Sequence, residues 1–236
     1  MNNYEKHAYL YASWVAVIIP CLCSAYIVQK YFFAEFNEIN VFINLISKFF
    51  SVSILVVIYG SVGFLVRNFF RATSKIIFQF PLFREDETKM PTTEMLLYRD
   101  HQISEEEKNV FRDKVEKLFN FKMKSAQTEE QNESEARLNI VSAVGFVKNY
   151  TRKDKIVEQA NYRYGFQRNQ LGGLVWSFLL CLICFIISIC VKNELIAVFG
   201  IATLLIIIQA VLAWILMKYA ARNYARTLIH SFISFK

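Results

Sequence analysis

The sequence predicts an all-α integral membrane protein with four transmembrane helices and a small helical cytoplasmic cap. Four long apolar stretches carry this prediction, at about 8–33, 41–66, 172–191 and 195–217. Each is close to the ~20 residues that a helix needs to cross a hydrocarbon core of about 30 Å. A helix of a soluble protein rarely stays apolar on all sides for so long, and lipid offers no partner to the edge of a sheet.

The composition agrees with a membrane protein. Of the 236 residues, 55% are hydrophobic and 22 are Phe, whereas only 7 are Gly and 3 are Pro. The low Gly and Pro content excludes a low-complexity or disordered chain. The first apolar stretch is long and is followed by no small-residue cleavage site, so we expect a permanent anchor rather than a signal peptide.

The distribution of positive charge predicts the orientation. Of 27 Lys and Arg residues, only Lys30, Lys48 and Lys192 lie in or beside the far half of the molecule. Cytoplasmic flanks carry the excess of Lys and Arg, so we place both termini and the long central connection in the cytoplasm. The chain then divides into a first helix pair (1–66), a cap (67–171), a second helix pair (172–217) and a basic cytoplasmic tail helix (218–236).

The cap region shows helix signals. Ser104 with Glu107 is a capping box and predicts a helix at about 105–120. Asn132 with Glu135 predicts a second helix at about 133–148, and Thr151 with Asp154 indicates a third that leads into the membrane. The expected buried residues of the first two helices are Phe111, Val115, Leu118, Ile140, Val144 and Val147.

Three other segments carry expectations about local structure. Ile76–Phe83 is predicted to be extended, and Ser125–Glu130 is predicted to be a flexible loop. The pair Gly172-Gly173 indicates either a bend or a tight helix crossing. Cys181 and Cys184 have the C-x-x-C spacing of a metal or redox site, but they share a helical stripe with serines, so we interpret them as packing residues.

Polar residues inside the second stretch suggest a pore. Asn44, Lys48 and Ser51 lie at i, i+4 and i+7, and a lysine at mid-depth costs about 2.5–3.5 kcal/mol on insertion scales. In one interpretation they line a pore, which requires a homo-oligomer such as a tetramer, because four helices do not easily enclose a channel. In the other, Lys48 snorkels to the interface while the other two bond neighbouring helices.

A second polar stripe lies on the tail. Arg222, Arg226 and His230 repeat every four residues beside Tyr219 and Tyr224. Arginine binds phosphate in a bidentate manner and aromatic rings stack bases, so one interpretation is a nucleotide site. Snorkelling arginines with an interfacial aromatic belt give the same pattern.

No catalytic motif is present in the sequence. The three histidines, His7, His101 and His230, lack the spacing of a metal site, and Glu105–Glu107 are expected to cap a helix. We therefore predict a protein that is not an enzyme and has neither a metal nor a resident cofactor.

Two segments resemble known sequences: PTTEMLLYRD (Pro91–Asp100) and YRYGFQRNQLGGLVWS (Tyr162–Ser177). They are similar to segments of bacterial four-transmembrane effectors encoded beside nucleotidyltransferases, in anti-phage defence systems of the CBASS and Hailong types. The resemblance implies an oligomeric ion channel that depolarises the bacterial inner membrane. It also implies a gate that responds to a nucleotide or oligonucleotide made by a cytoplasmic nucleotidyltransferase.

No ligand residue transfers from the family, and no SAVED domain is present. The resemblance therefore implies a ligand site built from the cap or between subunits, with Arg163, Arg168, Arg222 and Arg226 as the first candidates. A competing interpretation is a non-conducting membrane sensor or scaffold, as in Kiwa-type defence, that signals to a cytoplasmic partner. A transporter is disfavoured, because the sequence has no internal repeat and no pair of broken helices.

Overall fold

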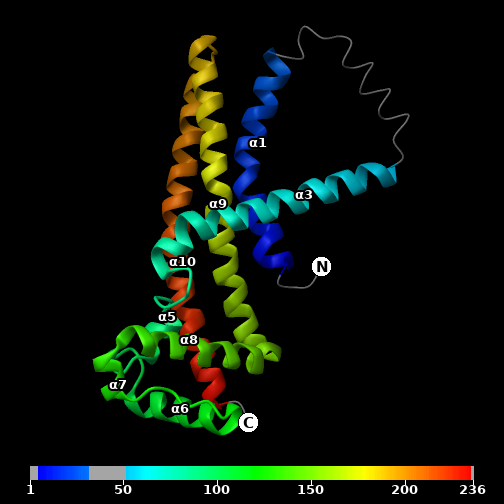
Figure 1. Cartoon of the computed structure of the whole chain (residues 1–236). Coiled ribbons are helices and arrows are strands. Elements are labelled where there is room, and N and C mark those ends of the chain that lie inside the picture. Colours follow the sequence, from blue (N-terminus) through cyan, green and yellow to red (C-terminus); the bar gives the residue numbers. More distant parts are fainter. Residues whose placement is uncertain (1–4, 32–51, 235–236) are drawn as a thin grey trace.

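A computed structural model describes residues 5–31 and 52–234, and every regular element within these ranges is a helix (Figure 1). Three of the described helices are long and apolar enough to cross a membrane: Lys6–Tyr31, Lys155–Cys190 and Ile196–Ser234. They include nearly all of the first, third and fourth predicted stretches. Residues 41–51 of the second stretch, with Asn44, Lys48 and Ser51, lie outside the described residues.

The three long helices form a row with α9 (Lys155–Cys190) in the middle. On one side lies α1 (Ala12–Tyr31), which follows the π-helical segment η1 (Glu5–Tyr11), and on the other lies α10 (Ile196–Ser234). Hydrogen bonds fix α1 parallel to α9 at a nearly constant sequence offset. They join Asn169 Nδ2 to the Ala8 carbonyl (2.7 Å), Ser177 Oγ to the Ala16 carbonyl (2.6 Å) and Asn193 Nδ2 to the Tyr31 hydroxyl (2.7 Å).

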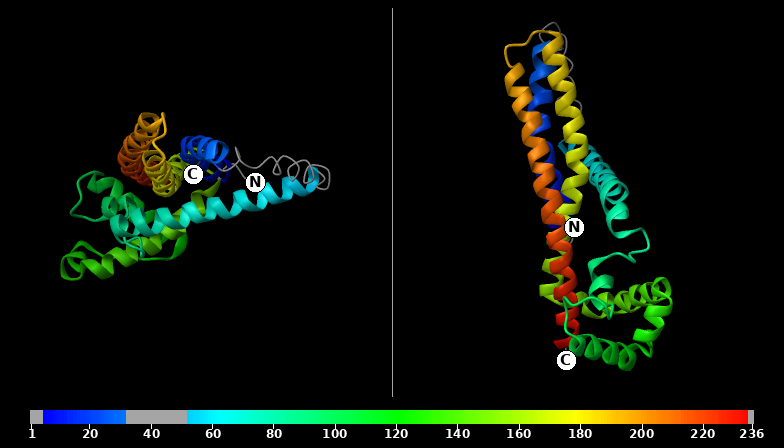
Figure 2. Two further views of the ribbon diagram at one scale, coloured as in Figure 1. Left: turned by 90° about the horizontal axis from the view of Figure 1, so that it is seen from above. Right: turned by 90° about the vertical axis from the view of Figure 1, so that its left-hand side faces the viewer.

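A short turn joins α9 to α10, which returns antiparallel. Lys192 adopts a left-handed conformation (φ 49°), and Asn193 Oδ1 accepts a hydrogen bond from the Leu195 N–H (2.8 Å). Both helices are much longer than their predicted membrane spans, with 36 and 39 residues. Figure 2 shows that α10 continues without a break from the far end of the row to the helices at the opposite end.

Helix α3 (Val52–Ser74) crosses the row instead of running along it (Figures 1 and 2). The crossing is at Gly172 and Gly173, where a Cβ atom would lie 2.0 Å from the Phe70 carbonyl oxygen and 2.7 Å from Ala16 Cβ, respectively. Only glycine lets two backbones approach so closely. The tight helix crossing is therefore confirmed, whereas α9 passes through both glycines as one helix.

Residues 52–66 of the second predicted stretch form the first part of α3, and this part extends away from α1, α9 and α10 (Figure 1). The described structure therefore does not confirm a four-helix bundle. The far end of α3 makes a wide angle with the row, while its last turns are held against α9. There Trp176 Nε1 donates to Thr73 Oγ1 (3.0 Å), and the ring of Trp176 contacts Phe69 (4.7 Å between centroids).

The segment Ile76–Phe83 is helical, so the extended prediction was wrong. The helical path of α3 continues through η2 (Lys75–Gln79, π-helical) into α4 (Phe80–Phe83) and ends at Arg84 (φ 60°). Pro81 lies in the first turn of α4, directly after the π-helical η2. Phe78 holds the segment by packing on Trp214 of α10 (5.6 Å between centroids).

Four helices build the cap: α5 (Pro91–Leu96), α6 (Glu105–Phe119), α7 (Ala126–Gln131) and α8 (Glu133–Tyr150). The capping box at Ser104 and the cap at Asn132 are confirmed. The predicted loop Ser125–Glu130 is wrong, because Ser125 caps α7. Thr151 opens a 3-10 turn (η3, Thr151–Lys153), and the cap of α9 is Asp154, whose carboxylate accepts from the Ile156 N–H (2.7 Å).

The core of the cap contains the end of α10. Phe232, fully buried, contacts Phe111 of α6 (5.1 Å between centroids), and Leu228 and Ile229 are buried in the same cluster. Five of the six expected core residues of α6 and α8 are buried, but Leu118 is 45% exposed. The basic tail is therefore the last part of α10, and its apolar face is part of the cap.

We predict that Gly172→Ala destabilises the fold, because its methyl group has no space beneath Phe70. Overpacking of this kind typically costs about 1–3 kcal/mol. Gly145→Ala on α8 is the control, since a Cβ there has no atom within 4 Å. Thermal unfolding of the detergent-solubilised protein should show a lower Tm for Gly172→Ala only. Equal Tm values for both variants would contradict the tight crossing.

Candidate functional site

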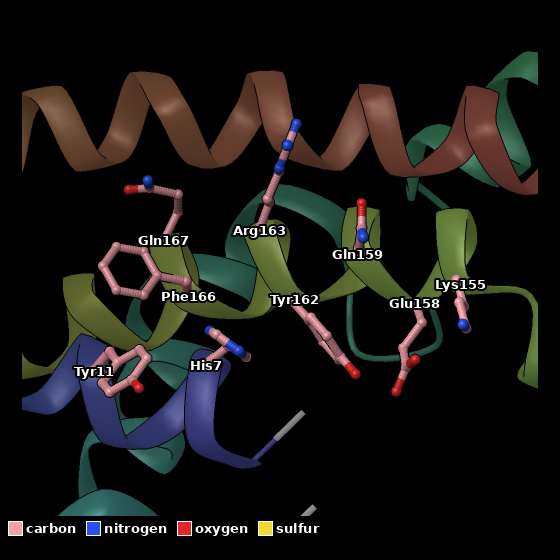
Figure 3. Close-up of a pocket in the computed structure, with 9 residues that line it drawn as sticks. All are labelled: His7, Tyr11, Lys155, Glu158, Gln159, Tyr162, Arg163, Phe166 and Gln167. Atoms are coloured by element: carbon pink, nitrogen blue, oxygen red, sulfur yellow. The ribbon is translucent and has the colours of Figure 1, made fainter. Parts of the chain in front are cut away.

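An open groove with a volume of 630 Å³ lies between η1 and the first turns of α9 (Figure 3). We call it the aromatic groove. Its lining residues are His7, Tyr11, Lys155, Glu158, Gln159, Tyr162, Arg163, Phe166 and Gln167. The volume is within the range of small-molecule sites, about 300–1,000 Å³. The groove precedes the apolar part of α9, on the side of the molecule that carries the cap.

One side of the aromatic groove consists of rings. The His7 imidazole stacks on Tyr162 (5.7 Å between centroids, interplanar angle 18°) and meets Tyr11 edge to face at 5.2 Å. Figure 3 shows these rings beside Phe166, on the side of α9 that faces η1. Because η1 is π-helical, it belongs to a class of local structure that is frequent at functional sites.

The other side is polar and positive. Arg163, Gln159 and Gln167 extend toward α10 in Figure 3, and the Arg163 side chain makes no ion pair with a described residue. The Gln167 Oε1 atom is buried and has no hydrogen-bond partner within the described structure. Together the two sides can receive a planar ring and an anionic group.

Arg168, a predicted anion-binding residue, lies elsewhere. It is only 7% exposed and donates to Gln79 Oε1 (3.0 Å) and Asn169 Oδ1 (3.3 Å) beside the α3–α9 crossing. Lys75 lies in η2, outside the three long helices. Burial lowers the pKa of its ammonium group, and the nearby positive charges of Arg71 and Arg168 lower it further. Arg168 therefore belongs to a positive cluster inside the fold and is separate from the aromatic groove.

Arg222, Arg226 and His230 are exposed on one face of α10, as their spacing predicts. His230 Nδ1 lies 3.5 Å from Glu107 Oε1. Of the two tyrosines predicted beside them, Tyr219 is 70% exposed, whereas Tyr224 is buried and stacks on Tyr164 (6.5 Å, 11°). Tyr224 is thus largely enclosed and borders a separate cavity of 410 Å³ with Lys148 and Arg152, whereas Arg222, Arg226 and His230 form an exposed cationic surface.

The cysteine stripe packs between helices, as predicted. Cys181 and Cys184 are buried with Ser177 and Ser188, and the Ser24 hydroxyl lies 3.8 Å from Cys184 Sγ across the α1–α9 interface. Within residues 5–31 and 52–234, no group of three His, Cys, Asp or Glu side chains could hold a metal ion. The stripe is thus part of the packing contact between α1 and α9.

The segment Pro91–Asp100 owes its shape to two buried cations of α6. Lys108 Nζ, fully buried, donates to the carbonyls of Leu97 (2.6 Å) and Asp100, and burial lowers its pKa. Arg112 donates to the Leu96 carbonyl (2.8 Å) and stacks on Tyr98 (4.1 Å to the ring centroid). Both cations therefore satisfy carbonyls at the end of α5.

The sequence did not single out His7, Tyr11 or Lys108 as site residues. His7 and Tyr11 are brought to α9 by the parallel packing of α1, which no local pattern specifies. Lys108 and Arg112 have the i, i+4 spacing of an ordinary solvated helix face. Only the path of the preceding segment shows that they are buried.

No family model matches the chain, and searches of the curated proteins and of the solved structures find no match either. The function therefore has to be argued from the site and from the arrangement of helices.

We predict that Lys108→Met destabilises the cap, because it removes the buried ammonium group that donates to the carbonyls of Leu97 and Asp100. A buried polar group that loses its partner costs about 1–3 kcal/mol. The control is Lys117→Met, an exposed position on the same helix. Limited proteolysis should cleave the Leu97–Asp100 segment of Lys108→Met much faster. Equal cleavage of both variants would show that Lys108 does not hold the segment.

Proposed function

We propose that this chain is the subunit of an oligomeric effector of the bacterial inner membrane, which conducts ions and is gated by a nucleotide or oligonucleotide. The observation that supports this proposal best is that two membrane helices continue into the cap. Helices α9 and α10 each run unbroken from the apolar row into the cap, and the last turns of α10 lie in the cap core. A movement of the cap is thus a movement of membrane helices.

The aromatic groove is well placed to act on this coupling. Its two sides come from η1, which leads directly into α1, and from the part of α9 nearest the cap. Arg163 and Gln167 extend from the groove toward α10 (Figure 3), so a ligand there stabilises whichever position of α10 relative to the α1–α9 unit fits it better. Two cations, Arg163 and Lys155, and four aromatic rings give the groove the chemistry of a nucleotide site.

The pore itself would have to form between subunits. The row of α1, α9 and α10 offers no polar path, because its buried Ser177, Ser188 and Thr203 hydroxyls donate to nearby helix carbonyls. Asn44, Lys48 and Ser51 remain the proposed pore-lining residues. With the Lys- and Arg-rich regions in the cytoplasm, both termini and the cap face the proposed partner, a cytoplasmic nucleotidyltransferase or its oligonucleotide product.

A second candidate is a non-conducting sensor or scaffold that signals to a cytoplasmic defence partner. The lack of a polar path through the described row favours this candidate. The continuous helix α10 could also carry a signal between the membrane and the cap in a protein that does not conduct ions. In that case membrane perturbation moves the cap and exposes a surface to the partner. Measurement of ion flux separates the two candidates.

We expect liposomes that contain the purified protein to show an ion flux that changes when short adenine oligonucleotides are added. The variant Lys48→Glu should invert or weaken the charge selectivity of this flux, because it reverses a charge in the proposed pore. Charge reversal of Lys117, exposed on α6, is the control for a general effect of charge. Absence of flux from a folded oligomer under all conditions would contradict the channel.

Binding to the groove can be measured separately from conduction. Arg163→Glu should weaken binding of a short adenine oligonucleotide about tenfold or more, because it replaces a cation that can contact phosphate with an anion. A tenfold change in affinity corresponds to about 1.4 kcal/mol. Arg152→Glu is the matched control, an exposed arginine on η3 outside the groove. Tyr11→Ala should weaken binding, whereas Tyr11→Phe keeps the ring. Calorimetry that shows equal affinities for all four variants would place the nucleotide site elsewhere.

A further inference from the structure

A second, apolar groove lies between α9 and α10 in the membrane part of the row. Its volume is 410 Å³, and we call it the apolar groove. Residues that define it are Leu174 and Phe178 of α9, Ile207, Val211 and Trp214 of α10, and Phe78 of η2. Its lining is almost entirely apolar. Leu171 and Leu174 flank Gly172, so the groove begins at the level of the α3–α9 crossing.

Among the described elements, the first part of α3 has no helix beside it (Figure 1). From Val52 to Val66 its sequence contains no charged residue, and the described side chains of Phe64 and Leu65 are 60% and 66% exposed. Figure 1 and the left view of Figure 2 show this part of α3 extending clear of α1, α9 and α10. A helix in this position exposes an apolar surface that another helix can cover.

The subunit's own α3 cannot fill the apolar groove. Its last turns are fixed on α9 by Phe70 and Trp176, and η2 then brings Phe78 to the edge of the groove. The free end of α3 points the other way. Seen from above in Figure 2, α10 and the free end of α3 lie at opposite edges of the subunit.

We propose that apolar side chains of α3 insert into the apolar groove of a neighbouring copy of this chain, and that copies associate head to tail into a closed ring. Surfaces at opposite edges of a subunit give a heterologous contact, which closes into a ring when the rotation permits. If the ring axis runs along the long helices, each α3 meets the next subunit at the level where the groove begins. This deepens the proposed function, since it names the contact that would build the oligomer.

Site-specific cross-linking tests the contact directly. The five native cysteines are first replaced by alanine. Two differently tagged chains are then co-expressed, one with Leu65→Cys and the other with Val211→Cys, and membranes are treated with a short bis-maleimide. An adduct that carries both tags can only form between copies. The matched control pairs Leu65→Cys with Leu212→Cys, because Leu212 is as exposed as Val211 (54% each) but does not line the groove.

The expected result is a doubly tagged adduct at least several-fold more abundant with Val211→Cys than with Leu212→Cys. Filling the groove gives a second readout: Ala210→Trp should lower the mass of the assembly in native mass spectrometry, whereas Leu212→Trp should not. Equal or absent adducts, or an unchanged mass for Ala210→Trp, would overturn the proposal and leave lipid chains in the groove. Rings without ion flux would overturn the channel alone, and flux without adducts would overturn only this contact.

Discussion

The close approach of α3 to α9 at Gly172 and Gly173 is the contact on which the rest of the arrangement depends. Because the Phe70 carbonyl occupies the space of a Cβ atom, α3 lies directly on the α9 backbone and cannot slide to another position. This position decides where η2 brings Phe78, and it decides in which direction the free part of α3 leaves the subunit. The same contact crowds Arg168 and Lys75 together at the boundary of the apolar segment, where like charges cost most if solvent is excluded.

The cap is a small helical unit that is built partly from short helices, and the backbone groups at the ends of these helices need partners. Helix α5 has only six residues and leaves its last carbonyls unsatisfied inside the protein. Lys108 and Arg112 supply the missing donors, and Arg137 ties Glu94 to the start of α8 (2.8 Å). The end of α10 then fills the remaining apolar space with Phe232. The core of the cap therefore includes the end of the long helix α10, which also belongs to the row.

Local signals in the sequence were sufficient for the helices they cap and insufficient for everything set by tertiary contact. Ser104, Glu107 and Asn132 predicted α6 and α8 closely, because capping acts within one turn. Apolar length predicted four membrane-spanning helices, and three of the described helices are long and apolar enough to cross a membrane. The crossing of α3 was not predictable in the same way, since its apolar composition is equally compatible with a span. Of the candidate site residues, Arg163 lines a groove, whereas Arg168 is buried, because a basic residue looks the same in sequence whether it is solvated or enclosed.

The two interfaces of α9 differ in chemistry, and this difference indicates which one can move. Toward α1, Asn169 and Ser177 bond to backbone carbonyls, so the register between these helices is fixed. Toward α10, the buried contact within the row is mostly apolar and includes Ala213, Ile206 and Met217. One hydrogen bond, from the Ser231 hydroxyl to the Asp154 carboxylate, joins the two helices at the cap. Apolar contacts are not directional, and packed helices slide past each other by small shear displacements. A signal that displaces the cap would therefore move α10 along a unit formed by α1 and α9, and the apolar groove, which lies on that interface, would change shape with it.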